Sequence, residues 1–131
     1  MIYDLVIIGA SAAGMSAGIY AARAGINFVI ISKDKGGNVA NAGIVENYLG
    51  TISKLGLELS KKFEAHLAEY GPKMIFGEVK RLTKENDIFI VDIGKEKIES
   101  KAVIVSTGAS HRKLNVPGEK VFENKGDLCN T

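Results

Sequence analysis

Cysteine, histidine and tryptophan are the residues that this sequence lacks or nearly lacks. Its 131 residues include one cysteine, two histidines and no tryptophan. A single cysteine excludes an internal disulfide and a zinc site built from several cysteines. Chains without disulfides are typical of reducing compartments, so we expect a cytoplasmic protein.

An excess of charge of either sign is also missing. The 17 basic and 15 acidic residues are well mixed and leave a net charge of +2, which argues against a nucleic-acid or membrane-surface partner. Residues 5–22 carry no charge, a feature shared with signal peptides and membrane-spanning helices. However, Asp4 replaces the positive start of a signal peptide, and the segment is rich in glycine, alanine and serine. We therefore interpret it as a strand followed by a closely packed helix.

The first 25 residues form the stretch around which the chain is organised. Leu5–Ile8 is a short apolar run rich in β-branched residues, which is typical of a central parallel strand buried on both faces. Gly9–Gly14 then predicts a tight turn. A helix is expected to run from the turn to about Ala24, where Gly25 is placed to end it.

This turn matches the dinucleotide fingerprint G-x-G-x-x-G except at its middle position, which is Ser11. The helix N-terminus behind it offers free N–H groups and a positive dipole end, which suit a phosphate. Because a side chain at Ser11 narrows the phosphate approach, the pattern predicts that Ser11→Gly leaves binding unchanged or improves it. A βαβ unit with a small-residue turn and no ligand is the alternative.

The second apolar run, Phe28–Ile31, predicts a second parallel strand. In dinucleotide sites an acidic residue near the end of this strand binds the ribose hydroxyls. Here Ser32 ends the strand and Asp34 follows, so either could take that role, although Asp34 could also be an exposed loop charge. The connection over residues 33–54 is long, and its glycine and asparagine content favours a backbone laid against a ligand over a surface loop.

The rest of the chain completes an α/β pattern. The expected elements are a helix over 55–70, a strand over 74–76, alternating strands over 78–82, 88–93 and 97–100, a buried strand over 102–105, and a polar loop from His111 onward. We therefore predict one domain over residues 1–131. It contains a Rossmann-like parallel sheet with a three-stranded antiparallel β-meander on one side.

Several short motifs occur together in a defined order. They are IIGASAAG and GIYAARAG at the start, GGN and VENYLG in the long connection, STGAS after the last strand, and VPGEKVF near the end. This order resembles the N-terminal FAD-binding segment of the thioredoxin reductases, a branch of the pyridine nucleotide-disulfide oxidoreductases. The resemblance covers nearly the whole chain and implies an FAD/NAD(P)-binding fold. In the complete enzyme of that family, electrons pass from NADPH through FAD to a disulfide.

The resemblance also implies which residues contact the cofactor. By position, these are Gly9, Ser11, Ala12, Ala13 and Gly14 at the FAD pyrophosphate, Ser32, Lys33 and Asp34 near the adenosine ribose, Gly37, Asn38 and Asn47 along the flavin, Val79 at the adenine, and Thr107, Gly108 and Ala109 beside the cofactor. Asn38 stands where the family has a longer glutamine.

Two departures from the family pattern qualify this interpretation. Cys129 matches the first, catalytic cysteine of the redox C-x-x-C motif, but the second would fall beyond Thr131. The NADPH domain and the segment that closes the FAD site in the family are not in this sequence. We therefore expect a chain that holds FAD poorly alone and that self-associates or pairs with a complementary chain. A non-catalytic, stand-alone nucleotide-binding or assembly module is the alternative.

Overall fold

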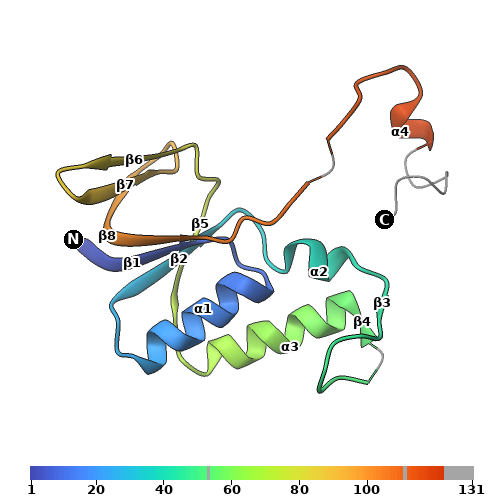
Figure 1. Cartoon of the computed structure of the whole chain (residues 1–131), viewed down its shortest axis with the longest axis horizontal. Coiled ribbons are helices and arrows are strands. Elements are labelled where there is room, and N and C mark those ends of the chain that lie inside the picture. Colours follow the sequence, from blue (N-terminus) through green and yellow to red (C-terminus); the bar gives the residue numbers. More distant parts are fainter. Residues whose placement is uncertain (53, 111, 123–131) are drawn as a thin grey trace.

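The computed structural model describes residues 1–52, 54–110 and 112–122 (Figure 1), so the predictions for His111 and Cys129 lie outside the described residues. In chain order the elements are β1 (Ile2–Ile8), α1 (Ala12–Arg23), β2 (Phe28–Ser32), α2 (Gly37–Asn41), β3 (Ile44–Val45), β4 (Lys54–Leu55), α3 (Gly56–Ala68), β5 (Lys73–Phe76), β6 (Arg81–Glu85), β7 (Ile88–Asp92), β8 (Lys97–Val105) and α4 (Glu119–Phe122). None of the helices described is long and apolar enough to cross a membrane.

Strand β1 lies inside a six-stranded sheet of order β5-β2-β1-β8-β7-β6. It pairs in parallel with β2 on one side and with β8 on the other, and β2 pairs in parallel with β5. The side chains of Val6 and Ile7 are completely buried. The prediction that the first apolar run forms an interior parallel strand is therefore confirmed.

The antiparallel meander consists of β6, β7 and the first part of β8. Its first strand runs over 81–85 rather than the predicted 78–82, because Asn86 and Asp87 form a two-residue turn that brings Glu85 opposite Ile88. Both turn residues have positive φ angles, 47° and 66°, as a tight hairpin turn of this kind requires.

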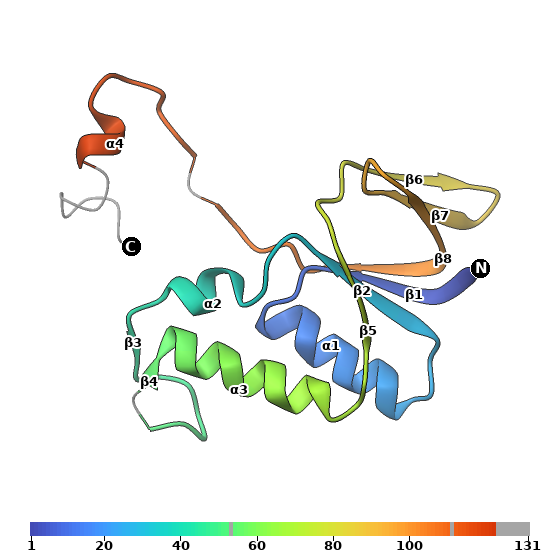
Figure 2. The ribbon, with the colours of Figure 1, turned by 180° about the vertical axis from the view of Figure 1, so that it is seen from behind.

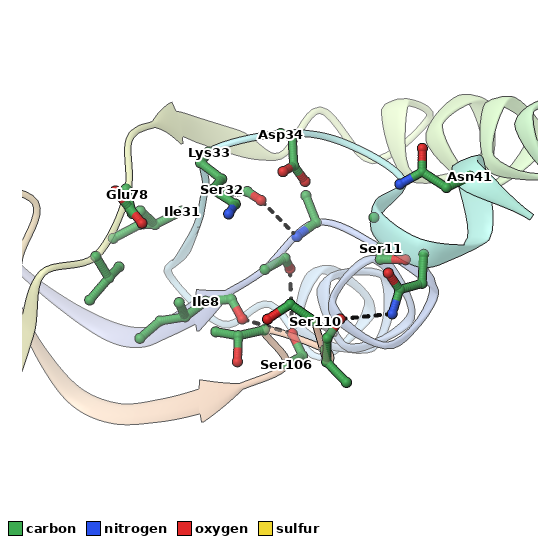
Figure 3. A pocket seen from close by; sticks show the side chains of 18 residues that line it. Ile8, Ser11, Ile31, Ser32, Lys33, Asp34, Asn41, Glu78, Ser106 and Ser110 are labelled. Atoms are coloured by element: carbon green, nitrogen blue, oxygen red, sulfur yellow. Dashed lines mark hydrogen bonds between the residues drawn. The ribbon is translucent and has the colours of Figure 1, made fainter. Parts of the chain in front are cut away.

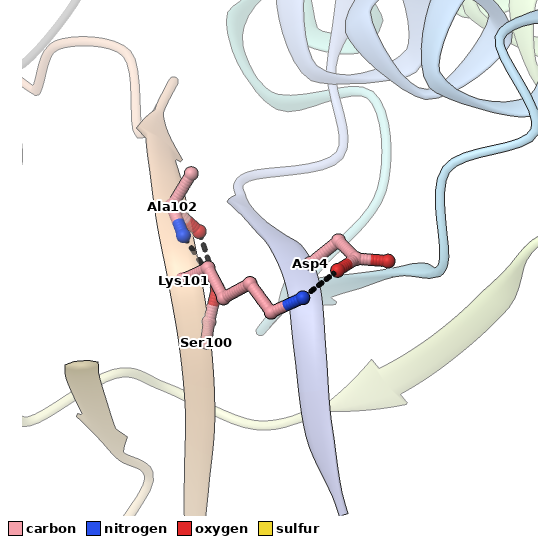
Figure 4. A network of polar contacts seen from close by, with 4 residues as sticks. All are labelled: Asp4, Ser100, Lys101 and Ala102. Carbon is pink, nitrogen blue, oxygen red and sulfur yellow. Dashed lines mark hydrogen bonds and ion pairs between the residues drawn. The ribbon is translucent and has the colours of Figure 1, made fainter.

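The predicted strands over 97–100 and 102–105 are one continuous strand, β8, so the expected break between them is wrong. The chain stays extended at Ser100, whose hydroxyl donates to the carbonyl oxygen of Ala102 and accepts from the backbone N–H of the same residue. β7 pairs with β8 only as far as Ser100, whereas β1 pairs with it from Glu99 to Val105. Beside this crossover, Lys101 on β8 donates to Asp4 on β1 (Figure 4).

The sheet has a different cover on each face (Figure 2). Helices α1 and α3 cover one face, where Met15 and Leu67 pack against Ile7 and Ile30. The meander curls over the opposite face, where Val91 packs in a second apolar cluster with side chains of β1 and β2. Two layers thus bury β1 and β2 on both sides, as their uninterrupted apolar sequence requires. The prediction of a buried strand over 102–105 is wrong in its burial, because Ile104 and Val105 at the end of β8 are 39% and 62% exposed.

The long connection after β2 contains structure that the sequence did not predict. It forms α2, β3 and β4, and the last two pair with each other. Helix α3 begins at Gly56, where a side chain would lie 2.1 Å from the carbonyl oxygen of Val39 on α2. The expected polar loop after His111 includes the short helix α4.

Candidate functional site

A cleft of about 550 Å³ opens at the carboxyl edge of the parallel strands (Figure 3). Its walls come from the segments that follow β1, β2, β5 and β8, together with α2. The lining residues are Ile8, Gly9, Ala10, Ser11, Ile31, Ser32, Lys33, Asp34, Gly37, Asn38, Asn41, Glu78, Val79, Ser106, Thr107, Gly108, Ala109 and Ser110. Ligands of open α/β sheets bind at this edge.

The turn after β1 is packed so closely that two positions accept only glycine. Gly9 has a φ of +111°, and a side-chain carbon there would lie 2.2 Å from the carbonyl oxygen of Ser106. At Gly14 such a carbon would lie 1.8 Å from the carbonyl oxygen of Gly9. These glycines bring the start of α1 against the ends of β1 and β8.

The N-terminus of α1 lies at one wall of the cleft. Ser11 is its N-cap residue, yet among the described residues its side chain makes no capping bond. The hydroxyl instead donates to the carbonyl oxygen of Gly36, at 2.6 Å. The first turn of α1 contains no acidic residue. Its N–H groups and the positive end of the helix dipole therefore suit an anion.

The end of β2 forms the adjoining wall. The Ser32 hydroxyl is buried and accepts a hydrogen bond from the backbone N–H of Ala10 at 3.2 Å. Lys33 and Asp34 are exposed and line the cleft beyond it. Glu78 lies across from them in Figure 3.

Glu78 keeps its negative charge in this setting. Its hydrogen bond to Lys80, the charge of Lys80 and, to a smaller extent, the charge of Lys33 lower the pKa of its carboxyl group. The cleft therefore offers an anionic acceptor at the end where β2 lacks an acidic residue.

The third wall is the segment after β8. Ser106 bonds to the carbonyl oxygen of Ile8 through both its backbone N–H, at 2.8 Å, and its hydroxyl, at 2.9 Å. Asn38, on α2, donates its side-chain amide to the carbonyl oxygen of Ala109 at 2.9 Å. Helix α2 and the loop after β8 are thus bonded to each other across 71 positions of sequence.

Most of the residues predicted from the sequence lie together in this cleft. They are Gly9, Ser11, Ser32, Lys33, Asp34, Gly37, Asn38, Val79, Thr107, Gly108 and Ala109. Gly14 instead packs beneath the turn, and Ala13 and Asn47 do not line the cleft. Ala12 lines a second groove, of about 410 Å³, between α1 and α3. Their role in binding stays a prediction, as does that of Cys129.

Sequence reasoning missed seven residues of the lining. These are Ile8, Ala10, Ile31, Asn41, Glu78, Ser106 and Ser110. Ile8, Ile31 and Ser106 could have been found, because the carboxyl ends of parallel strands meet at one edge of a sheet. Glu78 lies in the connection between β5 and β6, and no motif marks it.

Comparison with known proteins places these features in a family. The pyridine nucleotide-disulphide oxidoreductase family matches residues 3–131. The thioredoxin reductases of Bacillus subtilis and Listeria monocytogenes are 39% and 36% identical over 126 residues, which are 95% of this chain. The chain spans 40% of the length of each.

Solved structures agree with the sequence comparison. The thioredoxin reductase of Lactococcus lactis in the FR conformation superposes with a TM-score of 0.85 at 35% identity, over 92% of this chain and 40% of that one. The thioredoxin reductase of T. acidophilum superposes with a TM-score of 0.83 at 43% identity, over 95% of this chain and 41% of that one. The matched fractions of the two relatives, 40% and 41%, are nearly equal.

Proposed function

Because this chain belongs to the pyridine nucleotide-disulphide oxidoreductase family, we propose that it is the FAD-binding module of a thioredoxin reductase-like oxidoreductase. The cleft at the carboxyl edge of β1, β2 and β8 is the observation that carries the proposal. It combines a glycine turn, an α1 N-terminus without a side-chain cap among the described residues, and polar groups at the end of β2.

The residues present fit an elongated dinucleotide with a central pyrophosphate. Gly9 lets the turn pack tightly against Ser106 and so places the start of α1 at the cleft, where the N–H groups of Ala12 and Ala13 lie at the positive end of the helix. Lys33, Asp34 and Glu78 would bind the adenosine end. The segment Thr107–Ala109 would line the flavin side.

In this assignment the protein binds and orients, and the cofactor supplies the redox chemistry. When bound, the flavin would supply the electron transfer between NADPH and a disulfide in the complete enzyme. The residues of this chain would hold the cofactor and exclude water from one of its sides. Cys129 and a partner thiol would belong to the acceptor side.

A flavin titration with a matched pair of variants tests the proposal. Ala13→Asp places a carboxylate in the first turn of α1, where it favours the helix but repels a pyrophosphate. Ser16→Asp places the same charge on the same helix, beyond the first turn. Flavin fluorescence should show FAD binding to wild type and to Ser16→Asp, with affinity at least tenfold weaker for Ala13→Asp. Absence of binding to wild type, or equal binding to both variants, would overturn the proposal.

We also propose that a second chain or segment completes the cleft. Leu49, Ile52 and Ile44 are 99%, 92% and 67% exposed, and all three lie in the segment between α2 and α3. Large apolar side chains left exposed in one segment are a feature of interaction sites. FAD retention should therefore be higher in an assembled form than in the monomer, measured by flavin content after gel filtration. A strictly monomeric chain that keeps stoichiometric FAD would contradict this.

Dithiol turnover by this 131-residue sequence is not expected. A disulfide relay needs an attacking thiolate and a resolving partner, and Cys129 is the single cysteine. Mixed with NADPH and a protein disulfide, the pure chain should show no NADPH oxidation. Steady NADPH oxidation coupled to thiol release would contradict this prediction.

A further inference from the structure

Ser11 stands where the dinucleotide fingerprint has a glycine. Its hydroxyl takes neither of the two roles expected of a residue at this position. At this position a glycine lets backbone approach a phosphate, and a serine at a helix N-cap normally accepts from the N–H groups of the first turn. The Ser11 hydroxyl points instead at the loop after β2 and donates to Gly36 at 2.6 Å. The Ser11 hydroxyl is thus already engaged as a donor in a hydrogen bond within the protein.

The loop that receives this bond is packed tightly against the first turn. The backbone N–H of Gly36 donates to the carbonyl oxygen of Ala10 at 2.8 Å, so Gly36 bonds to two consecutive residues of the turn. A side chain at Gly37 would lie 3.3 Å from the β-carbon of Ser11. The carbonyl oxygen of Gly36 also accepts from the backbone N–H of Ala40, within α2, at 3.3 Å.

Helix α2, which follows this loop, is bonded in turn by Asn38 to Ala109 after β8. The loop and the start of α2 therefore lie between the turn after β1 and the loop after β8, with a side-chain hydrogen bond to each. Both bonds come from residues that differ from the family motifs, Ser11 for glycine and Asn38 for glutamine. Figure 3 shows Ser11 at the cleft, between Asn41 of α2 and Ser106.

We propose that Ser11 is a positioning residue that holds the β2–α2 loop against the start of α1 and so preforms the phosphate end of the cleft. The inference deepens, and rests on, the proposed FAD-binding function. Because the hydroxyl turns to Gly36, the N–H groups of Ala13 and Gly14, which an N-cap side chain normally binds, receive no capping bond from Ser11. One contact thus orders the loop and keeps the helix N-terminus open to an anion.

The proposal reverses the expectation from the fingerprint alone. Ser11→Gly and Ser11→Ala should both weaken FAD binding, because the loop must then be ordered when the cofactor binds. We expect Kd to rise about three- to tenfold, the effect of losing one neutral hydrogen bond. The global stability of the ligand-free protein should fall by no more than the contribution of this one hydrogen bond, because Ser11 makes no helix-capping bond within the described chain.

The experiment compares Ser11→Ala with Ser11→Thr, which retains the hydroxyl, and with Ser16→Ala, an exposed serine on the same helix. FAD affinity is measured by fluorescence titration. Hydrogen exchange of the Gly36 and Gly37 amides is measured on the ligand-free proteins. Ser11→Ala should bind FAD more weakly and exchange faster at these amides. Ser11→Thr should bind within about twofold of wild type, and Ser16→Ala should match wild type in both measurements.

Three results would overturn the proposal. Weaker binding with unchanged exchange would make the hydroxyl a direct phosphate ligand. Unchanged binding would show that the contact does not prepare the cleft, and equal losses in Ser11→Ala and Ser11→Thr would show that affinity does not follow the hydroxyl. Because exchange is measured without flavin, it tests the contact even if wild type fails to bind FAD. That failure would overturn the proposed function instead.

Discussion

At the scale of single residues, the ion pair between Asp4 and Lys101 bridges β1 and β8 at 2.7 Å. Its hydrogen bond and the charge of Lys101 lower the pKa of Asp4 from its ordinary value of 3.8. The stabilisation is therefore present above the unfolded-state pKa and disappears as the pH falls through the lower pKa of the folded state. We expect Asp4→Asn to be less stable than wild type at pH 7 and as stable as wild type near pH 2, in urea unfolding.

The control for this prediction removes the partner. Lys101→Met should reproduce the loss at pH 7, and the double variant should lose less than the sum of the two single variants. Strictly additive losses, or a difference that persists unchanged at pH 2, would show that Asp4 acts by some means other than this pair.

At this scale, the sequence predicts residues whose place follows from strand order. It does not predict hydrogen bonds between residues that are distant in the sequence. Ser32 ends β2 and Thr107 follows β8, so their place at the cleft could be predicted from strand order. The bonds of Ser11 and Asn38 could not, because their partners lie 25 and 71 positions away and depend on how the loops fold. Motif matching assigned both side chains to the cofactor, whereas the structure gives both a protein partner.

At the scale of elements, the close contact between α1 and β1 depends on Gly14. A β-carbon there would lie 1.8 Å from the carbonyl oxygen of Gly9, so Gly14→Ala must push the helix away from the strand. We expect a loss of about 3 kcal/mol or more in the free energy of unfolding, because backbone atoms cannot yield as side chains do. Chemical unfolding of the ligand-free chain measures it.

Gly25, after the end of the same helix, supplies the matched control. It has open space around it and a φ of +67°, so Gly25→Ala introduces only left-handed backbone strain. That strain should cost about 1–2 kcal/mol. Equal losses at the two positions would show that the approach of α1 to β1 is not what Gly14 provides.

Element type was predictable along most of the chain, and element boundaries less so. The apolar runs at Leu5–Ile8 and Phe28–Ile31 correctly predicted interior strands, since burial on both faces leaves an unbroken apolar pattern. The apolar periodicity changes at Ser100 because β8 leaves β7 there and continues beside β1. In the sequence, such a change looks the same as a break between two strands. The apolar periodicity of a strand reflects which of its faces are buried, and this burial can change along a single strand.

At the scale of the whole molecule, a ligand that binds only the folded state must raise its stability. FAD at a hundred times its Kd should add about 2.7 kcal/mol to the free energy of unfolding, which for a chain of this size raises Tm by about 10 °C. Riboflavin lacks the pyrophosphate that the α1 N-terminus is proposed to bind, so it should raise Tm far less at the same concentration. Thermal melts with each compound test this prediction. Equal shifts in Tm would show that the pyrophosphate does not contribute to binding.

The pairing of β1 with β8 also has a consequence for how the chain is made. The two strands of the central pair stand 97 positions apart at Asp4 and Lys101, so β1 leaves the ribosome well before β8 does. Until β8 emerges, one edge of β1 stays unpaired and its apolar side chains lack half of their cover. Non-local pairings of this kind make folding slow and leave nascent chains prone to aggregate. A nascent chain stalled before β8 should therefore bind holding chaperones that release it once residue 105 is clear of the exit tunnel.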